Sequence, residues 1–256
     1  MLVSQNYPKV SVILALNKID QYTDIAISSI LDQVDVSFEL ILVANGEYYK
    51  VVEKALLERY GGIAFVSVLS TPIPQLTYAL NFAVSHARAD YIARMDADDI
   101  SIINRLHIQL NFMLDKNLDL LGSDVTLIDE NGVKLGKRSY PRGMNINKLL
   151  PFRNCFCHPS VIFKKEVFYK ARGYNAGFNS EDYDLWLRLM RIGVKWDNIA
   201  QPLLYYRVHQ STAQGTRLAY SECLALSVRE FFINKSFIRF LAICSHAVKF
   251  FYKKMR

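Results

Sequence analysis

An α/β fold with a mostly parallel central sheet flanked by helices is predicted by two features of the sequence. Short apolar runs rich in β-branched residues alternate with segments of helical periodicity through roughly the first 100 residues. These runs are apolar throughout, as is typical of strands that are covered on both faces. Because connections of helical length join them, a right-handed, doubly wound arrangement is expected for the first half.

The first half is expected to contain four strands and three helices. The expected strands are 9–16, 38–43, 63–69 and 91–95, and the expected helices are 22–31, 48–60 and 76–87. Sheets of this kind bind ligands at the carboxyl ends of their parallel strands. Residues 15–17, 44–46 and 96–99, which follow three of these strands, are therefore expected to lie together.

The second half has a different pattern. A helix is expected over 102–114, followed by a hairpin with strands 118–128 and 133–140 around the Asn131-Gly132 turn. Further strands are expected near 157–163, 194–196 and 203–208, and a helix over 181–190. No repeat, low-complexity segment or linker divides the chain. One domain is therefore expected over 1–215, followed by a basic amphipathic helical tail over 216–256.

Composition and charge indicate a globular protein with a basic tail. The sequence is 51% hydrophobic and 21% charged, which excludes a disordered chain. The net charge is +7, and +6 of it lies in residues 229–256, where seven bases accompany the single acid Glu230. The body is nearly neutral, which argues against a nucleic-acid-binding surface across the main domain.

Cysteine usage and the amino-terminal residues indicate a reducing compartment. The four cysteines do not form a disulfide framework or the paired spacing of a zinc site, so Cys155 and Cys157 are expected to be ordinary core residues. Residues 1–8 lack a basic segment followed by an apolar one, so no signal peptide is expected. No uncharged apolar run of about 18 residues occurs, so no conventional membrane span is expected.

The strongest chemical signal is the acidic segment 94–99, Arg-Met-Asp-Ala-Asp-Asp, at the end of a predicted strand. Three carboxylates this close repel one another, and their pKa values would be raised unless a cation lies among them. A hard divalent metal prefers such oxygen ligands. Capping the next helix needs only one or two acids. A metal site is therefore favoured over a solvated capping turn.

Two further polar clusters each have a structural and a functional interpretation. Residues 180–184, Ser-Glu-Asp-Tyr-Asp, begin a predicted helix, where Ser180 would cap and the acids would favour the helix dipole. Alternatively, one of these acids is a general base for a substrate hydroxyl. His209 follows the last predicted strand and is either structural or a metal ligand beside the carboxylates.

Together these segments resemble the inverting glycosyltransferases of family 2, which have the nucleotide-sugar-binding GT-A fold. The nearest branch builds bacterial exopolysaccharide and O-antigen repeats and is of the amylovoran-biosynthesis type. The resemblance runs from about Pro8 to Ser211 and is carried by VSVILALN, FELILVANGE, QLTYALNFAVSHARADYIARMDADDIS with Arg105-Leu106, HPSVIF, EDYDLWLRL and YYRVH. One such motif would be weak evidence, but six in the family's order and spacing are specific.

The resemblance implies a reaction and a set of site residues. The implied reaction is metal-dependent, inverting transfer of a hexose from a nucleotide diphosphate sugar, with UDP expected, to a saccharide acceptor that is expected to be lipid-linked. Bacterial surface polysaccharide synthesis is the implied setting, and Mn²⁺ or Mg²⁺ the implied cofactor. The implied donor-binding residues are Leu16, Asn17, Asn45, Arg94 and Asp96, the metal ligands Asp96, Asp98, Asp99 and His209, and the catalytic residues Asp182, as the base, and Glu181.

The sequence departs from the family pattern in two places. The second strand ends in Ala-Asn at 44–45 where the family has an Asp pair, and the first lacks the usual Pro within 15–17. Both departures leave the donor base open and do not touch the metal or base residues. The segment 158–160, His-Pro-Ser, is expected either to shape the acceptor side or to turn the chain. Trp186 is a candidate for contact with an acceptor.

Two rival functions remain open at this stage. A nucleotidyltransferase also gathers carboxylates at strand ends, but it would need a glycine-rich phosphate loop, which the segment after Leu16 lacks. A catalytically inactive scaffold that binds sugar nucleotides is favoured slightly by Ala44. The intact acid triplet, Asp182 and His209 argue against that scaffold.

The tail is strongly apolar over 224–252 but is interrupted by Lys235, Arg239 and Lys249. This pattern favours a helix that lies in a membrane interface, with its bases towards anionic headgroups. The alternative is an amphipathic helix packed on the catalytic body or on a second copy in a homodimer. The expected location is the cytoplasm, with peripheral association at the inner face of the cell membrane.

Overall fold

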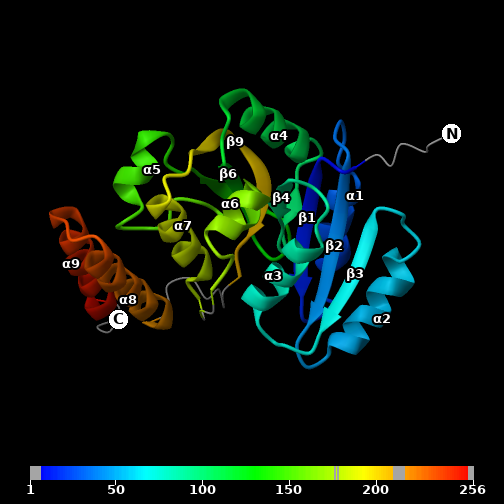
Figure 1. Cartoon of the computed structure of the whole chain (residues 1–256). Helices are drawn as coiled ribbons and strands as arrows, with labels where there is room; N and C mark the ends of the chain where they lie inside the picture. The colour runs from blue at the N-terminus through cyan, green and yellow to red at the C-terminus, as the bar shows by residue number, and fades with distance from the viewer. Residues whose placement is uncertain (1–6, 176, 178, 210–216, 253–256) are drawn as a thin grey trace.

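A computed structural model describes residues 7–175, 177, 179–209 and 217–252 (Figure 1). Within them, nine strands pair in one sheet. The strands are β1 (Val10–Leu16), β2 (Phe38–Asn45), β3 (Val66–Thr71), β4 (Tyr91–Arg94), β5 (Ile100–Ser101), β6 (Leu120–Ile128), β7 (Lys134–Arg138), β8 (Ile162–Lys164) and β9 (Trp196–Arg207). Their order is β3-β2-β1-β4-β8-β6-β9-β5, and β7 pairs with β6.

Strand direction divides the sheet into two parts. Strands β3, β2, β1 and β4 are parallel, as predicted for the first half. Strand β8 runs antiparallel to β4, while β6 and β9 pair in parallel, so the second part is mixed. The carboxyl end of β4 thus lies where the parallel part meets the mixed part.

Helices cover both faces of the sheet. On one face pack α1 (Thr23–Leu31), α2 (Tyr49–Tyr60) and α4 (Arg105–Lys116); on the other pack α3 (Leu76–His86), α5 (Met144–Leu149), α6 (Lys165–Lys170) and α7 (Glu181–Arg191). Strand β1 shows the cause: Val12 and Leu14 join the first core cluster, and Ile13 joins the second. Because successive strand side chains point to opposite faces, burial on both faces requires an apolar run.

Four predicted elements differ from the structure. The helix expected from residue 102 begins at Arg105, because Ile100–Ser101 pair with β9 as β5. The two short strands expected at 194–196 and 203–208 form one strand, β9, whose register shifts near Pro202. Proline has no amide N–H to donate within a sheet, so its presence in the sequence argues against a continuous strand. Within 157–163, a 3₁₀ turn, η1 (His158–Ser160), precedes β8.

The tail forms two helices, α8 (Arg217–Ile233) and α9 (Phe237–Tyr252), where one was predicted. They lie side by side at the left edge of Figure 1. Their inner side contacts the body: Nε2 of His246 lies 3.3 Å from the hydroxyl of Tyr183 in α7. Buried Glu230 forms ion pairs with Arg191 of α7 and with Arg239 of α9. Among the described helices, none is long and apolar enough to cross a bilayer.

Candidate functional site

The acidic segment after β4 brings three carboxylates together. Oxygen atoms of Asp96, Asp98 and Asp99 all lie within 4.8 Å of one another. Asp99 is only 1% exposed, and burial together with the two neighbouring carboxylates raises its pKa well above the usual range. Its Oδ2 has no hydrogen-bond partner among the described residues. A desolvated carboxylate cluster with an unsatisfied buried oxygen fits a divalent cation.

Arg207, at the end of β9, fixes the shape of the acidic turn. Its backbone N–H donates to Oδ1 of Asp99, and its Nε donates to the carbonyl oxygen of Asp98, both at 2.8 Å. Its guanidinium lies 4.2 Å from the centre of the Tyr22 ring. Two residues further on, Nε2 of His209 lies 2.8 Å from Oδ2 of Asp98. The structure therefore places His209 beside the acid triplet.

Two buried arginines, Arg94 and Arg105, contact the acidic segment and the end of the strand before it. The guanidinium of Arg94 forms an ion pair with Asp96. Arg105 donates from Nη2 to the carbonyl oxygen of Arg94 and from Nε to Oε1 of Gln109, both at 2.9 Å. Burial lowers the pKa of Arg105 to about 10. Gln109 in turn donates to the carbonyl oxygen of Ser160, so this pair ties the end of β4 to η1.

Glu181 and Asp182 begin α7. Nδ2 of Asn154 donates to Oδ2 of Asp182, and the backbone N–H of Tyr183 donates to Oδ1, both at 2.6 Å. Burial raises the pKa of Asp182; burial and the nearby Asp182 raise the pKa of Glu181 to about 7. Ser180 occupies the N-cap position but makes no side-chain capping bond. The predicted cap by Ser180 is therefore wrong, whereas Glu181 and Asp182 do lie in the first turn of α7.

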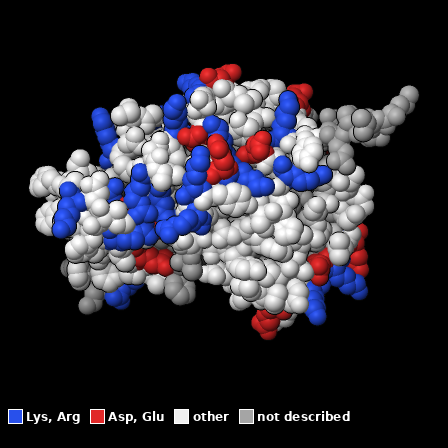
Figure 2. All heavy atoms as spheres, in the orientation of Figure 1, with Lys and Arg blue, Asp and Glu red and all other residues white. Residues whose placement is uncertain are grey.

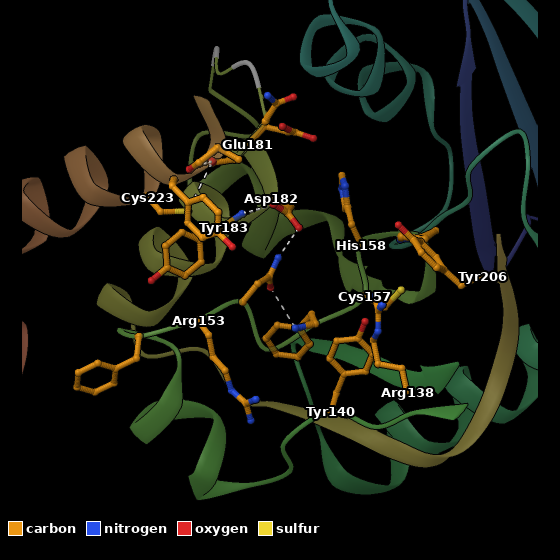
Figure 3. Close-up of a pocket in the computed structure, with 18 of the residues that line it drawn as sticks. Arg138, Tyr140, Arg153, Cys157, His158, Glu181, Asp182, Tyr183, Tyr206 and Cys223 are labelled. Carbon is orange, nitrogen blue, oxygen red and sulfur yellow. Dashed lines mark hydrogen bonds between the residues drawn. The ribbon is translucent and has the colours of Figure 1, made fainter. Parts of the chain in front are cut away.

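A cavity of about 710 Å³ joins the two acidic sites (Figure 3). Asp96 of the acid triplet lines it together with Arg94, and Glu181 and Asp182 line it as well. Its aromatic lining residues are Tyr140, Phe152, Phe156, Tyr183, Tyr206 and Tyr220. Figure 3 shows the Asp182 carboxyl group pointing into the space between α7, Tyr140 in the segment after β7, and Tyr206 on β9. Such a mixture of aromatic walls and a few convergent polar groups is typical of small-ligand sites.

The predicted donor residues of β1 and β2 lie apart from this cavity. Leu16 and Asn45 are buried and Asn17 is exposed, and none of the three lines the cavity. In the sheet order, β1 and β2 lie on one side of β4, whereas β8, β6 and β9 lie on the other. The acid triplet, which follows β4, therefore lies between two regions of the sheet edge. One region is beside β1 and β2, and the other is beside β8, β6 and β9.

Known proteins of one family match this sequence and fold. The profile described as "Glycosyl transferase family 2" matches residues 11–179. The chain belongs to glycosyl transferase family 2. The "O-antigen biosynthesis glycosyltransferase WbnJ" of Escherichia coli is 44% identical, over 94% of this chain and 95% of that protein. The E. coli "UDP-Gal:alpha-D-GlcNAc-diphosphoundecaprenol beta-1,3-galactosyltransferase" is 31% identical, over 93% and 94%.

A solved structure confirms the predicted fold class of this glycosyltransferase. Residues 1–349 of S. aureus TarS in complex with UDP-GlcNAc superpose with a TM-score of 0.73, covering 95% of this chain and 73% of that one. The two sequences are 14% identical, so this likeness concerns the fold. The family predicted from the six motifs is confirmed by the profile match and by the full-length relatives.

Two expectations about side chains of the glycosyltransferase are settled by burial. Trp186 is completely buried, so the predicted contact with an acceptor is wrong; its ring instead packs 5.4 Å from that of Phe156, which lines the cavity. Cys155 and Cys157 are core residues, as predicted, and burial raises the pKa of each thiol to about 12. His158 lines the cavity within η1, so the His-Pro-Ser segment both turns the chain and shapes the cavity.

Sequence reasoning placed none of three residues that organise the site of this family 2 enzyme at that site, and it assigned Lys249 only to the basic face of the tail. Arg207 belongs to the YYRVH segment and is the last residue of β9, two positions before His209. That spacing was a usable signal. Asn154 holds Asp182 from 28 positions away, and Lys249 reaches the cavity from the tail. No local pattern marks either of them.

Proposed function

We propose that this glycosyltransferase transfers a hexose, with inversion, from a nucleotide diphosphate sugar to a lipid-linked saccharide in bacterial surface polysaccharide synthesis. The observation that carries the proposal is the cavity that connects the acid triplet to the Glu181–Asp182 pair. The names of the two E. coli relatives support it, because one refers to O-antigen biosynthesis and the other to a diphosphoundecaprenol acceptor. UDP is the expected nucleotide.

At the donor end, the chain offers a ligand set for a divalent ion. Asp96, Asp98, Asp99 and His209 would hold Mn²⁺ or Mg²⁺, and the imidazole favours manganese. When bound, such an ion supplies positive charge that stabilises the departing nucleoside diphosphate. The ion pair with Arg94 orients the carboxylate of Asp96.

The nucleotide itself is assigned to the other side of the triplet. Leu16, Asn17 and Asn45, at the carboxyl ends of β1 and β2, would bind the base and ribose. The sheet order supports this assignment, because it leaves the cavity on the β8–β6 side for the acceptor.

At the acceptor end, Asp182 would act as the general base. Its two oxygen atoms are held by Asn154 and by the backbone N–H of Tyr183, which fixes the carboxylate in the cavity. The attacking hydroxyl oxygen of the acceptor forms a bond to the anomeric carbon while its proton passes to Asp182. The nucleoside diphosphate leaves from the opposite face with the electrons of the broken C–O bond, so the configuration is inverted. Glu181 stands beside the base.

A binding and hydrolysis screen tests this function against its two rivals. A nucleotide sugar that binds the folded protein is expected to raise its melting temperature in the presence of Mn²⁺. The same donor should then slowly release nucleoside diphosphate in a reaction that excess chelator stops. A scaffold would bind without release, and a nucleotidyltransferase would release pyrophosphate from a nucleoside triphosphate. Either result would contradict the proposal.

We further propose that the tail holds the enzyme on the inner face of the cell membrane. The large apolar side chains that α8 and α9 expose are Leu218, Phe232, Ile233, Phe237, Ile238, Phe240, Leu241, Val248, Phe251 and Tyr252. Because the inner side of the hairpin already packs on α7, this outer surface is available for lipid headgroups and acyl chains. The bases Lys253, Lys254 and Arg256 of the prediction lie outside the described residues.

Vesicle co-sedimentation is expected to detect this association. Full-length protein should sediment with anionic vesicles at low salt and much less with neutral ones, because each base near an anionic surface contributes about 1 kcal/mol. Replacing exposed Phe232 and Phe237 by Ser should weaken sedimentation, whereas Ile103→Ser, at an exposed apolar position on the body, should not. Equal sedimentation of all variants would contradict the membrane role. A concentration-dependent dimer lost in the Phe variants would assign the surface to a homodimer instead.

A further inference from the structure

The cavity extends past Asp182 to the junction between the catalytic body and the tail. Arg153, in the loop after α5, and Lys249, on α9, both line it there. Nζ of Lys249 donates to the carbonyl oxygen of Phe152 at 2.6 Å. Nε2 of His246 lies 3.1 Å from the carbonyl oxygen of Pro151. The tail is therefore fixed to the loop that carries Arg153.

Among the residues that the structure describes, these two cations have no acidic partner. Within the described part of the chain, no carboxylate oxygen lies within 4.0 Å of the Arg153 guanidinium or the Lys249 ammonium, whereas the tail bases Arg229 and Arg239 both pair with Glu230. Burial, together with the charge of Arg153, lowers the pKa of Lys249. Two like charges held together in a cavity repel, and a bound anion would relieve this repulsion. In Figure 2, Lys and Arg side chains also gather over the part of the surface that α5 and α7 occupy in Figure 1.

One short segment links the cations to the proposed base. Asn154 follows Arg153 directly, and it donates a hydrogen bond to Asp182 at 2.6 Å. With a sugar hydroxyl group against Asp182, an anomeric substituent that points towards this segment would bring its charge next to Arg153. Figure 3 shows Arg153 away from His158 and Tyr206, and thus away from the donor end of the cavity. The acid triplet at that donor end would serve the diphosphate of the nucleotide sugar instead.

We infer that Arg153 and Lys249 form a subsite for the diphosphate group of a diphosphate-linked acceptor. Arginine offers paired N–H donors that match phosphate oxygens, and lysine offers a compact charge. The inference rests on the proposed transfer function and adds the residues that recognise the charged part of the acceptor. It also gives the tail a direct role in substrate binding, because α9 supplies one of the two cations.

Calorimetry with geranyl diphosphate tests the subsite without any transfer reaction. Excess chelator is present, so that no metal at the acid triplet recruits the diphosphate. The wild type is expected to bind geranyl diphosphate and not geraniol. Arg153→Gln and Lys249→Gln should each raise Kd by roughly 10-fold, the usual effect of losing one charged hydrogen-bonding partner. Lys249→Arg should retain most of the affinity. Lys148→Gln, which removes an exposed base of α5 outside the cavity, is the matched control.

Each outcome of this experiment bears on the subsite. Failure of the wild type to bind geranyl diphosphate, equal affinity for geraniol, or unchanged affinity in Arg153→Gln would overturn it. Arg153 is exposed and makes no ion pair in the described structure, so its replacement leaves the fold unstrained. Transfer assays distinguish failure of the subsite from failure of the proposed transfer function. If the subsite alone is wrong, the wild type still uses nucleotide sugars, whereas failure of the proposed function abolishes that use.

Discussion

Asp98→Asn is expected to reduce sugar transfer to background while leaving the fold intact. An amide carries no charge and is a poor ligand for a hard divalent ion, so the variant should lose the positive charge that the site is built to hold. The fold should survive because the Asp98 side chain is 36% exposed and because the amide oxygen of Asn can still accept a hydrogen bond from His209. Replacing buried Asp99 would instead remove its bond from the Arg207 backbone.

Transfer assays with Mn²⁺, followed by melting curves, check this expectation. Asp90→Asn is the matched control, because Asp90 immediately precedes β4 at the end of the strand away from the acid triplet and its side chain is exposed. The control should keep wild-type activity and Asp98→Asn should keep a wild-type melting temperature. Full activity of Asp98→Asn, or of the wild type in excess chelator, would contradict the metal site.

The parallel half and the acid triplet were predictable because their signals are local. A strand buried on both faces must be apolar along its whole length, and the run Val10–Leu16 shows this directly. Asp96, Asp98 and Asp99 follow their strand within a few residues, so their proximity needs no tertiary information. The placement of His209 beside Asp98 came from the family resemblance, since the two residues lie 111 positions apart.

Other parts of the site depend on contacts that no local pattern records. Strand β9 was divided in the prediction because Pro202 interrupts its ladder. The division of the tail into two helices depends on packing: Arg239 of α9 folds back to reach Glu230 of α8. Trp186 was offered as an acceptor contact on residue type alone, and only the packing around α7 shows that it is buried. Asn154 is likewise identified by the side chain that it meets.

Asp182→Asn is expected to lower turnover by roughly 10²–10⁴-fold, the usual contribution of a positioned proton acceptor. The amide has nearly the same shape but cannot take a proton from the attacking hydroxyl. Donor affinity should hardly change, because Asp182 lines the cavity on the acceptor side of the acid triplet. Turnover under saturating substrates and calorimetric donor binding measure the two effects separately. Glu166→Gln, in the first turn of α6, is the control for loss of an acid near a helix start.

The pH dependence of turnover is a second test of the role of Asp182. A carboxyl group with a raised pKa is protonated below that pKa, and a general base must be unprotonated. Because burial and Asp182 raise the pKa of Glu181 to about 7, the pair should retain a proton in acid, and wild-type turnover should rise through about pH 7. In Asp182→Asn the negative charge beside Glu181 is absent, so the pKa of Glu181 should fall. The pH at which the residual activity rises should therefore shift to a lower value. Donor binding measured across the same range separates this effect from titration of the acid triplet. Loss of donor binding with normal turnover of the bound donor would place Asp182 in the donor site and leave Glu181 as the candidate base.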